Sequence, residues 1–358
     1  GLARVPSGFI PTEDQGYLMV TADLPKGSSL ERTQQAMNEI REVISKVPGV
    51  DNIVTIGGIS VLNSSTSQAS SGVQYVILKP WNVRGKAKNE NLKSIYEAIS
   101  KALTTVQSAN AKVLLPPDIP GLGMSGGFSM QLVLTDGSNS FDKLAAATQD
   151  FIAEAQKLPE IMVAFTPFTN TVPQYELTFN VERAEILGVR IGDAYDVLQS
   201  YVGSSYVNQF FKYGQTYQVY VQADGEFRNK AEDISRLYVK SSTSEMVPLG
   251  SFIDIKETFG PPIASLYNLY PTAAVVGAAA ASVSSGQALD ALSQLAQDTL
   301  PEGVSYLWTA MSFQEQLVGN TQILVFALSI LLVYLVLAAQ YESWVAPIAV
   351  LSAVPLAL

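Results

Sequence analysis

The chain has 358 residues and contains neither cysteine nor histidine. These two absences exclude disulfides, thiolate nucleophiles, Cys/His zinc sites and catalysis by imidazole. The 22 Lys and Arg against 32 Asp and Glu give a net charge of -10, which argues against nucleic acid as a partner. Hydrophobic residues make up 47% of the chain and charged residues only 15%, so we expect part of it to meet lipid.

A strand–helix–strand pattern recurs along residues 1–312. The copies begin at the apolar segments GYLMVTADLP (16–25), VQYVILKPW (73–81), FSMQLVLTDG (128–137) and TAAVVGAAA (272–280). In the helix after the first of these, Ser28 and Glu31 have the spacing of a capping box, and Pro48 predicts the end of the helix. Ser140 and Pro159 bound the helix of the third copy in the same way.

These copies predict an α+β fold made of repeated βαβ, ferredoxin-like split sandwiches, with the helices on one face of a mostly antiparallel sheet. Residues 15–120 are expected to form the first sandwich, after a connector over 1–14. The last two copies are far apart in the chain. We therefore expect a discontinuous second sandwich, 121–167 and 258–312, interrupted by a small inserted α+β domain over 168–257.

The apolar excess lies in the C-terminal part. Residues 323–339 contain only one serine and one tyrosine as polar side chains. At about 1.5 Å per residue this run can span a hydrocarbon core of about 30 Å, where a helix satisfies its own backbone. We expect a transmembrane helix over 313–340 and the start of another over 344–358. Because the second run stops at residue 358, we expect a piece of a longer membrane protein.

No motif for catalysis or phosphate binding stands out. Paired carboxylates such as Glu13 with Asp14 have no candidate nucleophile beside them in the sequence. The Gly-rich stretch 121–127 lacks a Lys after its last Gly and precedes a strand, which argues against a phosphate loop. We therefore predict no catalytic residues, no cofactor and no metal site.

The Ser-rich stretch 57–72 has low charge and leaves two alternatives open. It is either a flexible linker between two strands or a mobile loop over an apolar cleft. In the second case Ile59, Val61 and Leu62 would face the cleft, with Tyr75 on the strand behind.

The Pro/Gly stretch 114–128 also leaves two alternatives open. It is either a linker between the two sandwiches or the floor of a cleft, where ligands tend to bind between domains. The candidate lining residues of this stretch are Leu114, Leu115, Met124 and Phe128.

Four regions carry a resemblance to a known family. They are PSGFIPTEDQG (6–16), VERAEILGV with SSYVNQF (181–189 and 204–210), YLWTAMSFQEQ (306–316) and LAAQYESWVAP (337–347). In this order they resemble the multidrug-exporting inner-membrane transporters of the resistance-nodulation-division superfamily. The resemblance implies the second large periplasmic loop, the eighth transmembrane helix and the start of the ninth, with two porter sandwiches and an inserted docking subdomain.

The resemblance implies a function as well. It implies a secondary active transporter, not an enzyme, that exports hydrophobic and amphiphilic compounds by proton antiport. The implied protein is a homotrimer, multi-pass in the bacterial inner membrane, whose partners are a periplasmic adaptor protein and an outer-membrane channel. Most of this chain would be periplasmic, and the family's proton relay would lie outside it. The alternative class is a membrane-anchored periplasmic binding or scaffold module without transport activity.

The resemblance gives the stretch 57–72 the place of the family's switch loop, with Gly57, Gly58 and Gly72 as its hinges. Ile59 and Val61 align where well-known members use Phe, which argues against aromatic stacking with flat drugs.

Further positions follow from the same resemblance. Met19 matches a pocket-lining Met, and Tyr75 falls where members commonly carry an aromatic residue. Thr166 falls where many members place an Arg at the substrate entrance, so a strong preference for anionic drugs is not expected. The docking-loop candidates are Tyr206, Asn208 and Phe210.

Overall fold

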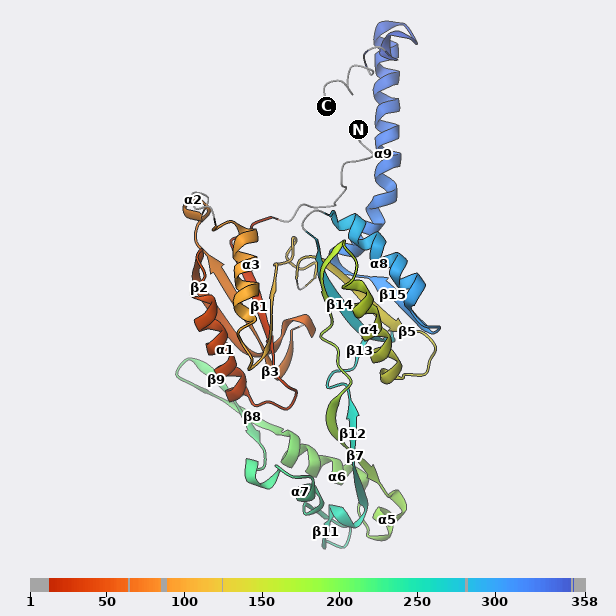
Figure 1. Cartoon of the computed structure of the whole chain (residues 1–358). Helices are drawn as coiled ribbons and strands as arrows, with labels where there is room; N and C mark the ends of the chain where they lie inside the picture. The colour runs from red at the N-terminus through yellow and green to blue at the C-terminus, as the bar shows by residue number, and fades with distance from the viewer. Residues whose placement is uncertain are drawn as a thin grey trace. The chain divides into compact units, whose positions relative to one another are not determined.

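The computed structural model describes residues 13–63, 65–84, 89–123, 125–280, 283–348 and 350. The chain divides into two compact units, Gly1–Asn170 with Pro261–Leu358, and Thr171–Gly260 (Figure 1). The second unit begins and ends a few residues later than the predicted insertion over 168–257. Both units combine helices with strands, which confirms the α+β class.

The N-terminal part of the first unit is a four-stranded antiparallel sheet with two long helices packed on it (Figure 1). Its strand order is β2-β3-β1-β4, in which the first and third strands of the chain are central. A split βαβ unit has this order. The elements are β1 (Tyr17–Asp23), α1 (Leu30–Ile44), β2 (Val50–Ser60), β3 (Thr66–Leu78), α2 (Trp81–Arg84), α3 (Leu92–Leu103) and β4 (Asn110–Leu114).

Both faces of this sheet are apolar, because successive side chains of a strand point to opposite faces. Leu18 of β1 packs with Ile40 of α1 and Ile99 of α3 in one buried cluster. Met19, the next residue, belongs to a different cluster that includes Phe165 of the second sheet. The helices therefore cover one face of the first sheet, and the second sheet covers part of the other.

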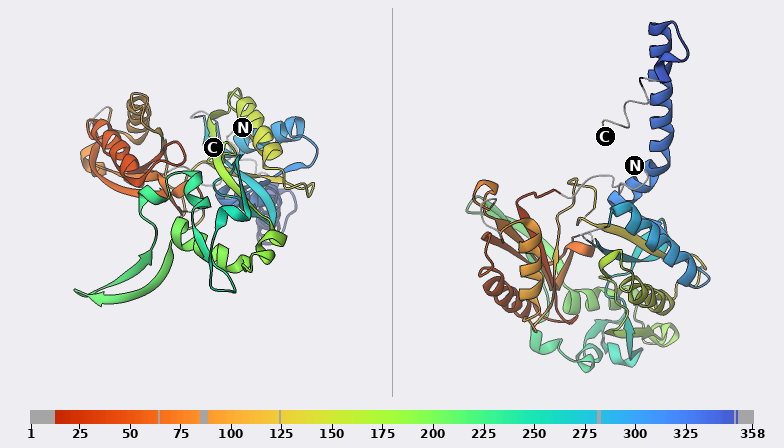
Figure 2. Two further views of the ribbon diagram at one scale, coloured as in Figure 1. Left: turned by 90° about the horizontal axis from the view of Figure 1, so that it is seen from below. Right: turned by 45° about the horizontal axis from the view of Figure 1, so that its top comes forward.

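The second sheet repeats the same order in the rest of the first unit. β15, β5 and β14 are neighbours, and β6 and β13 both pair with β14. The two helices of this half, α4 and α8, pack side by side on one face of the sheet (Figure 2). The elements are β5 (Phe128–Leu134), α4 (Phe141–Ala155), β6 (Ile161–Phe165), β13 (Ser265–Tyr267), β14 (Tyr270–Ala279), α8 (Ser285–Thr299) and β15 (Val304–Trp308).

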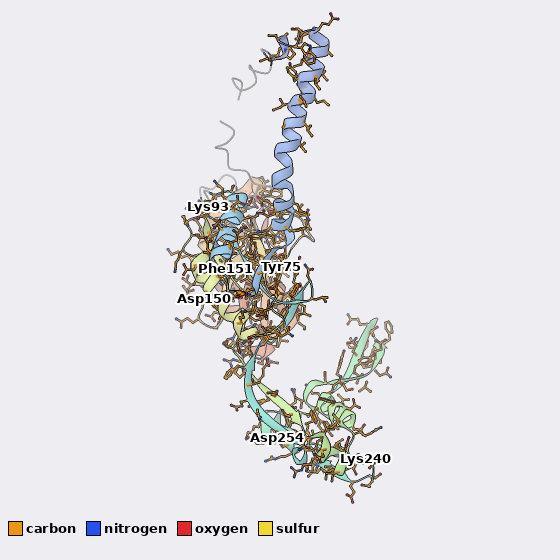
Figure 3. All side chains as sticks on the ribbon, turned by 90° about the vertical axis from the view of Figure 1, so that its right-hand side faces the viewer. Tyr75, Lys93, Asp150, Phe151, Lys240 and Asp254 are labelled. Atoms are coloured by element: carbon orange, nitrogen blue, oxygen red, sulfur yellow. The ribbon has the colours of Figure 1, made fainter. Side chains whose placement is uncertain are left out.

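The second unit has a small core of its own. Ala184, Val239, Leu249 and Phe252 are buried together in it. A hairpin of two strands, β8 and β9, projects from this core (Figure 3). The elements are β7 (Val172–Phe179), α5 (Val181–Ile186), α6 (Ile191–Leu198), β8 (Ser205–Lys212), β9 (Gln215–Val221), α7 (Ala231–Ser235), β10 (Tyr238–Lys240), β11 (Met246–Pro248) and β12 (Ile253–Gly260).

The caps of two helices test the sequence prediction directly. Ser29 caps α1 by accepting a hydrogen bond from the backbone N–H of Arg32 at 3.4 Å. The predicted cap, Ser28, is wrong by one residue, because its hydroxyl instead donates to the carbonyl oxygen of Pro25. Ser140 confirms its prediction: it accepts from the N–H of Lys143 at 3.3 Å and begins α4.

The stretch 57–72 is mostly strand rather than the linker or loop that its composition indicates. β2 and β3 pair as far as Ser60 and Thr66, with a shift of register between Gly57 and Ile59. A single 3-10 turn, Val61–Asn63, follows β2. Pairing with a neighbouring strand overrides the weak strand propensity of Gly and Ser, and local composition does not reveal that pairing.

The last helix, α9 (Ala310–Tyr341), covers the segment predicted to cross a membrane. Part of that prediction falls on residues 318–324 and 326, whose side chains lie outside the described residues. Among the residues that the structure describes, no helix combines the length and the apolar character needed to cross a bilayer. The predicted span over 313–340 is therefore not supported by them. Most of the predicted run over 344–358 lies outside the described residues.

A buried ion pair ties the start of the described chain to the first sandwich. Arg84, only 3% exposed, donates from Nη1 and Nη2 to the two carboxylate oxygens of Asp14 at 2.7 and 2.9 Å. Its Nε donates to the carbonyl oxygen of Lys79. Burial raises the pKa of Asp14, but the hydrogen bonds from Arg84 and from the N–H of Gly16, with the Arg84 charge, outweigh burial and leave that pKa lowered.

Replacing Asp14 by Asn should lower the free energy of unfolding by about 3 kcal/mol at neutral pH, because it leaves a buried guanidinium without its carboxylate. Since the folded-state pKa of Asp14 is lowered, the stabilisation is present above the unfolded pKa and is lost as the pH falls through the folded one. Denaturant titrations of the full chain at neutral and acidic pH measure both effects. Asp51→Asn, at an exposed carboxylate, is the matched control; equal stability of the two variants at neutral pH would contradict the prediction.

Candidate functional site

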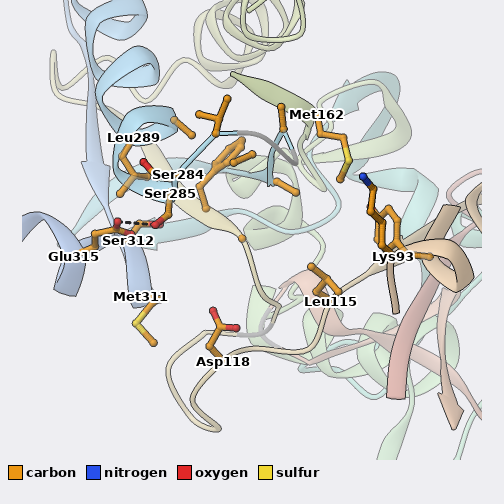
Figure 4. Close-up of a pocket in the computed structure, with 18 of the residues that line it drawn as sticks. Lys93, Leu115, Asp118, Met162, Ser284, Ser285, Leu289, Met311, Ser312 and Glu315 are labelled. Atoms are coloured by element: carbon orange, nitrogen blue, oxygen red, sulfur yellow. Dashed lines mark hydrogen bonds between the residues drawn. The ribbon is translucent and has the colours of Figure 1, made fainter. Parts of the chain in front are cut away.

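A cavity of about 590 Å³ lies between the two sandwiches of the first unit (Figure 4). Its walls come from α3 of the first sandwich, from β14 and α8 of the second, and from the first turns of α9. Small-molecule sites in proteins commonly measure about 300–1,000 Å³. Its larger apolar lining residues are Leu92, Tyr96, Leu115, Phe128, Met162, Leu289 and Met311.

The charged groups that line this cavity are mostly acidic. Glu97, Asp118 and Glu315 contribute carboxylates, against one ammonium from Lys93. The hydroxyl of Ser285 donates to Oε1 of Glu315 at 2.6 Å, which holds that carboxylate against α8 (Figure 4). A cavity with this balance favours cationic over anionic ligands.

Asp118 is a lining carboxylate with a perturbed ionisation. Burial raises its pKa, and the negative charge of Glu13 raises it further. A cationic ligand beside Asp118 would favour the charged carboxylate and oppose both effects.

A second apolar feature lies where the helix-free faces of the two sheets meet. The strand register puts Tyr75, Met19 and Leu114 side by side on β3, β1 and β4. Phe165 of β6 and Val276 of β14 pack against this row from the second sheet. We call this group the intersheet cluster; its members are Tyr17, Met19, Ile59, Val61, Leu62, Val73, Tyr75, Leu114, Val163, Phe165 and Val276.

The intersheet cluster is closed in this structure. The void beside Leu114 and Phe165 measures only about 20 Å³, which is enough for little more than one water molecule. A ligand would reach the buried members, such as Met19 and Leu114, only if the two sandwiches moved apart.

Comparison with protein families matches residues 1–358 to the AcrB/AcrD/AcrF family. The chain belongs to this family. The match covers every region on which the resemblance to resistance-nodulation-division transporters was based, and that prediction is confirmed.

Similar proteins within the AcrB/AcrD/AcrF family carry names that refer to efflux or drug resistance. The multidrug/solvent efflux pump membrane transporter MepB of Pseudomonas putida is 37% identical over 357 residues. The multidrug export protein AcrF and the multidrug resistance protein MdtF of Escherichia coli K12 are 34% and 33% identical over 361 and 359 residues. Each alignment covers 99% of this chain but only 33–34% of the relative, so the chain spans about a third of their length.

The structure brings most of the candidate substrate-path residues of this family member to the two features described above. Six of them lie in the intersheet cluster, namely Met19, Ile59, Val61, Leu62, Tyr75 and Leu114. Leu115 and Phe128 line the cavity instead. Met124 lies outside the described residues.

Thr166 lies at the end of β6, beside the intersheet cluster in sequence, but its hydroxyl is already engaged. It donates to the carbonyl oxygen of Ala274 at 2.5 Å and accepts from the N–H of Phe168 at 3.1 Å. These two hydrogen bonds fix the chain directly after β6, and the threonine side chain brings no charge to this position.

The three candidate hinge glycines lie within strands β2 and β3 rather than at the ends of a loop. Gly58 has a φ of +82° at the register shift, which a side chain rarely tolerates. Gly72 packs under the side chain of Met37, where an added Cβ would lie 3.0 Å from its Sδ and Cε atoms. Gly72 therefore faces α1, away from the intersheet cluster.

The docking-loop candidates lie in the second unit, on the hairpin. Tyr206 and Phe210 of β8 are about half exposed, and Asn208 is exposed between them.

Sequence reasoning missed the acidic side of the cavity. Glu97 stands near no motif in the sequence, and Glu315 lies within YLWTAMSFQEQ (306–316), which indicated the family and not a binding site. Asp118 did give a signal, since it is the one charge in the Pro/Gly stretch 114–128. Only the packing of α3, α8 and α9 around the same space brings these three carboxylates to one cavity.

Phe128 owes its position in the cavity wall to a glycine on the neighbouring strand. An added Cβ at Gly277 of β14 would lie 2.4 Å from the Phe128 ring and 2.1 Å from the carbonyl oxygen of Val163. The ring and the backbone of β6 together fill the space that a side chain would need. Gly277 thus sets how closely β5, β14 and β6 approach each other.

Gly277→Ala should displace the Phe128 ring or the β6 backbone and lower the free energy of unfolding by about 1–3 kcal/mol, the usual cost of overpacking. The matched control is Gly192→Ala in α6, which meets nothing within 4 Å and should raise the free energy of unfolding by about 0.4–1 kcal/mol. Denaturant titration gives the stability of each full-chain variant. A Gly277→Ala variant as stable as its control would show that the ring does not hold this position.

Proposed function

We propose that this chain is the substrate-handling part of a proton-driven transporter that exports hydrophobic and amphiphilic compounds through an outer-membrane channel. One observation carries the proposal: a member of the AcrB/AcrD/AcrF family has a cavity of about 590 Å³, lined by apolar and acidic side chains, between its two sandwiches. In this proposal both halves of the first unit are ferredoxin-like porter sandwiches, and the second unit is the docking subdomain.

The mechanism needs no reacting group in this chain. A ligand would bind first in the cavity, where apolar walls remove its hydrocarbon part from water and the carboxylates of Glu97, Asp118 and Glu315 favour a positive charge. Movement of one sandwich relative to the other would then open the intersheet cluster as the next apolar surface. The energy would come from proton antiport at residues outside this chain.

The stretch 57–72 would act as the switch between these two surfaces. Its residues Ile59, Val61 and Leu62 pack in the intersheet cluster. Gly58, at the register shift between β2 and β3, would give this pair of strands a point of flexibility. A change in the β2–β3 pair would thus alter the intersheet cluster directly.

The whole protein would be a homotrimer, multi-pass in the bacterial inner membrane, with most of this chain on the periplasmic side. The names of the relatives MepB and AcrF, a membrane transporter and an export protein, support this placement. Many described side chains in the second half of α9, such as Leu332 and Val336, are apolar and exposed, so they require a non-aqueous neighbour in the assembled protein.

Export can be tested in cells that lack their own efflux pumps and express the intact transporter containing this chain. They should accumulate less of a fluorescent amphiphile than cells with the empty vector. Ala280→Trp, which places an indole in the cavity wall, should reduce export about tenfold if the clash costs about 1.4 kcal/mol of affinity.

The control for the cavity is Gln294→Trp, on the exposed side of α8 and outside the cavity lining. Equal accumulation in cells with and without the transporter would refute the export function and favour a binding or scaffold module. Equal export by the two tryptophan variants would refute the role of the cavity but not the export function.

The hairpin supports the proposed contact with an adaptor or an outer-membrane channel. Phe211 and Tyr213 are 74% and 84% exposed, and Phe210 stacks on Tyr217 with ring centroids 5.4 Å apart. Lys212 is the only charged residue of β8 and β9. An isolated two-stranded hairpin with so many exposed aromatic rings is typical of a segment that becomes buried on assembly.

Replacing Phe210 and Phe211 together by Ser should weaken co-purification of the transporter with its channel and adaptor about tenfold or more, as the loss of buried aromatic anchors does. Phe227→Ser removes an exposed ring of the same unit outside the hairpin and is the control. Unchanged co-purification of the double variant would remove the hairpin from the interface.

A further inference from the structure

Lys112 brings a positive charge to the intersheet cluster. It lies on β4, two residues before Leu114 and therefore on the same face of the sheet, opposite Thr21 of β1. Its Nζ atom lies 4.0 Å from the centroid of the Phe165 ring, which belongs to the second sandwich. This cation–π contact joins the two sandwiches where their helix-free faces meet.

The charge on Lys112 is not matched by a carboxylate of its own. Asp23, the nearby acid that acts on it, already accepts a hydrogen bond from Ser71 at 2.6 Å and lies 3.5 Å from Nζ of Lys26. Among the described residues, Lys112 itself forms no ion pair. One positive charge therefore remains at this edge of the cluster.

Holding this ammonium half-buried costs free energy. Burial lowers the pKa of Lys112, and the negative charge of Asp23 opposes that effect. The ring of Phe165 offers a weaker partner than a carboxylate would, because it presents only the negative face of its quadrupole. An anion in the same place would compensate the buried charge more fully.

Apolar surface continues from Lys112 along the same face of the sheet. Leu114, Met19 and Tyr75 follow in a row across β4, β1 and β3. A cation at one end of an apolar strip is complementary to an amphiphile with an anionic head group. Thr166, the neighbour of Phe165 in the chain, has an uncharged side chain whose hydroxyl donates to the carbonyl oxygen of Ala274.

We propose that Lys112 is a specificity-determining residue that binds the anionic head group of amphiphilic substrates when the two sandwiches separate. The head group replaces the Phe165 ring as partner of the ammonium, and the tail lies on Met19, Tyr75 and Leu114. The inference rests on the proposed export function and assigns a substrate class to the intersheet cluster. The acidic cavity and the cationic cluster then serve amphiphiles of opposite charge.

The test compares three detergents that share one tail and differ in head group: dodecyl sulfate, dodecyltrimethylammonium and dodecyl maltoside. Pump-deficient cells expressing the intact transporter are assayed for the concentration of each that stops growth. Lys112→Met should lower protection against dodecyl sulfate about tenfold, the effect of losing one charge-assisted contact, and leave the other two unchanged.

Two controls and one replacement variant separate recognition of the head group from an effect on folding. Lys112→Arg keeps the charge and should keep protection against dodecyl sulfate. Lys101→Met removes the same charge from an exposed position on α3 and should change nothing. If the Met variant does not accumulate in the membrane fraction, Lys112→Gln, which keeps a polar side chain, takes its place.

The outcomes distinguish this inference from the function on which it rests. An equal loss of protection against all three detergents, or no loss with any of them, overturns the role of Lys112 while export stands. A wild-type transporter that protects against none of the three overturns the proposed export function and the role of Lys112 with it.

Discussion

The first unit depends on one physical constraint: two sheets, each covered by helices on one face, bury part of their other faces against each other. In β1 successive side chains point to opposite faces of the sheet. Leu18 packs in the core beneath α1 and α3, and Met19 packs in the intersheet cluster. β14 does the same with Val275 and Val276. Strands buried on both faces lose the usual alternation of apolar and polar side chains.

This constraint produces both the intersheet cluster and the cavity. Where the two sheets touch, the intersheet cluster excludes all but a small void. Where the sandwiches diverge, α3 faces α8 and α9 across the cavity. In the transport function proposed above, a small relative movement of the two sandwiches would exchange closed for open surface.

Particular elements show how far the sequence reaches. The amphipathic helices and apolar strands of the repeats were predictable because their periodicity reflects the face that each element buries. The stretch 57–72 was mistaken for a linker or loop, since Gly and Ser pair there through backbone hydrogen bonds that depend on the neighbouring strand. The N-cap of α1 was placed one residue early, because a turn at Pro25 engages Ser28. Glu97 and Glu315 were missed, because they lie in helices far apart in the chain.

The sequence by itself determined the α+β class, the repeated strand–helix–strand units, membership in a transporter family and the absence of Cys and His chemistry. These properties reside in composition, short-range periodicity and local motifs. Only the tertiary structure decided that Met19, Tyr75 and Leu114 form one row, that three carboxylates line one cavity, and that Lys112 meets Phe165 of the other sandwich. Each of these contacts joins residues from separate elements, and the packing of two sheets through their helix-free faces brings them together.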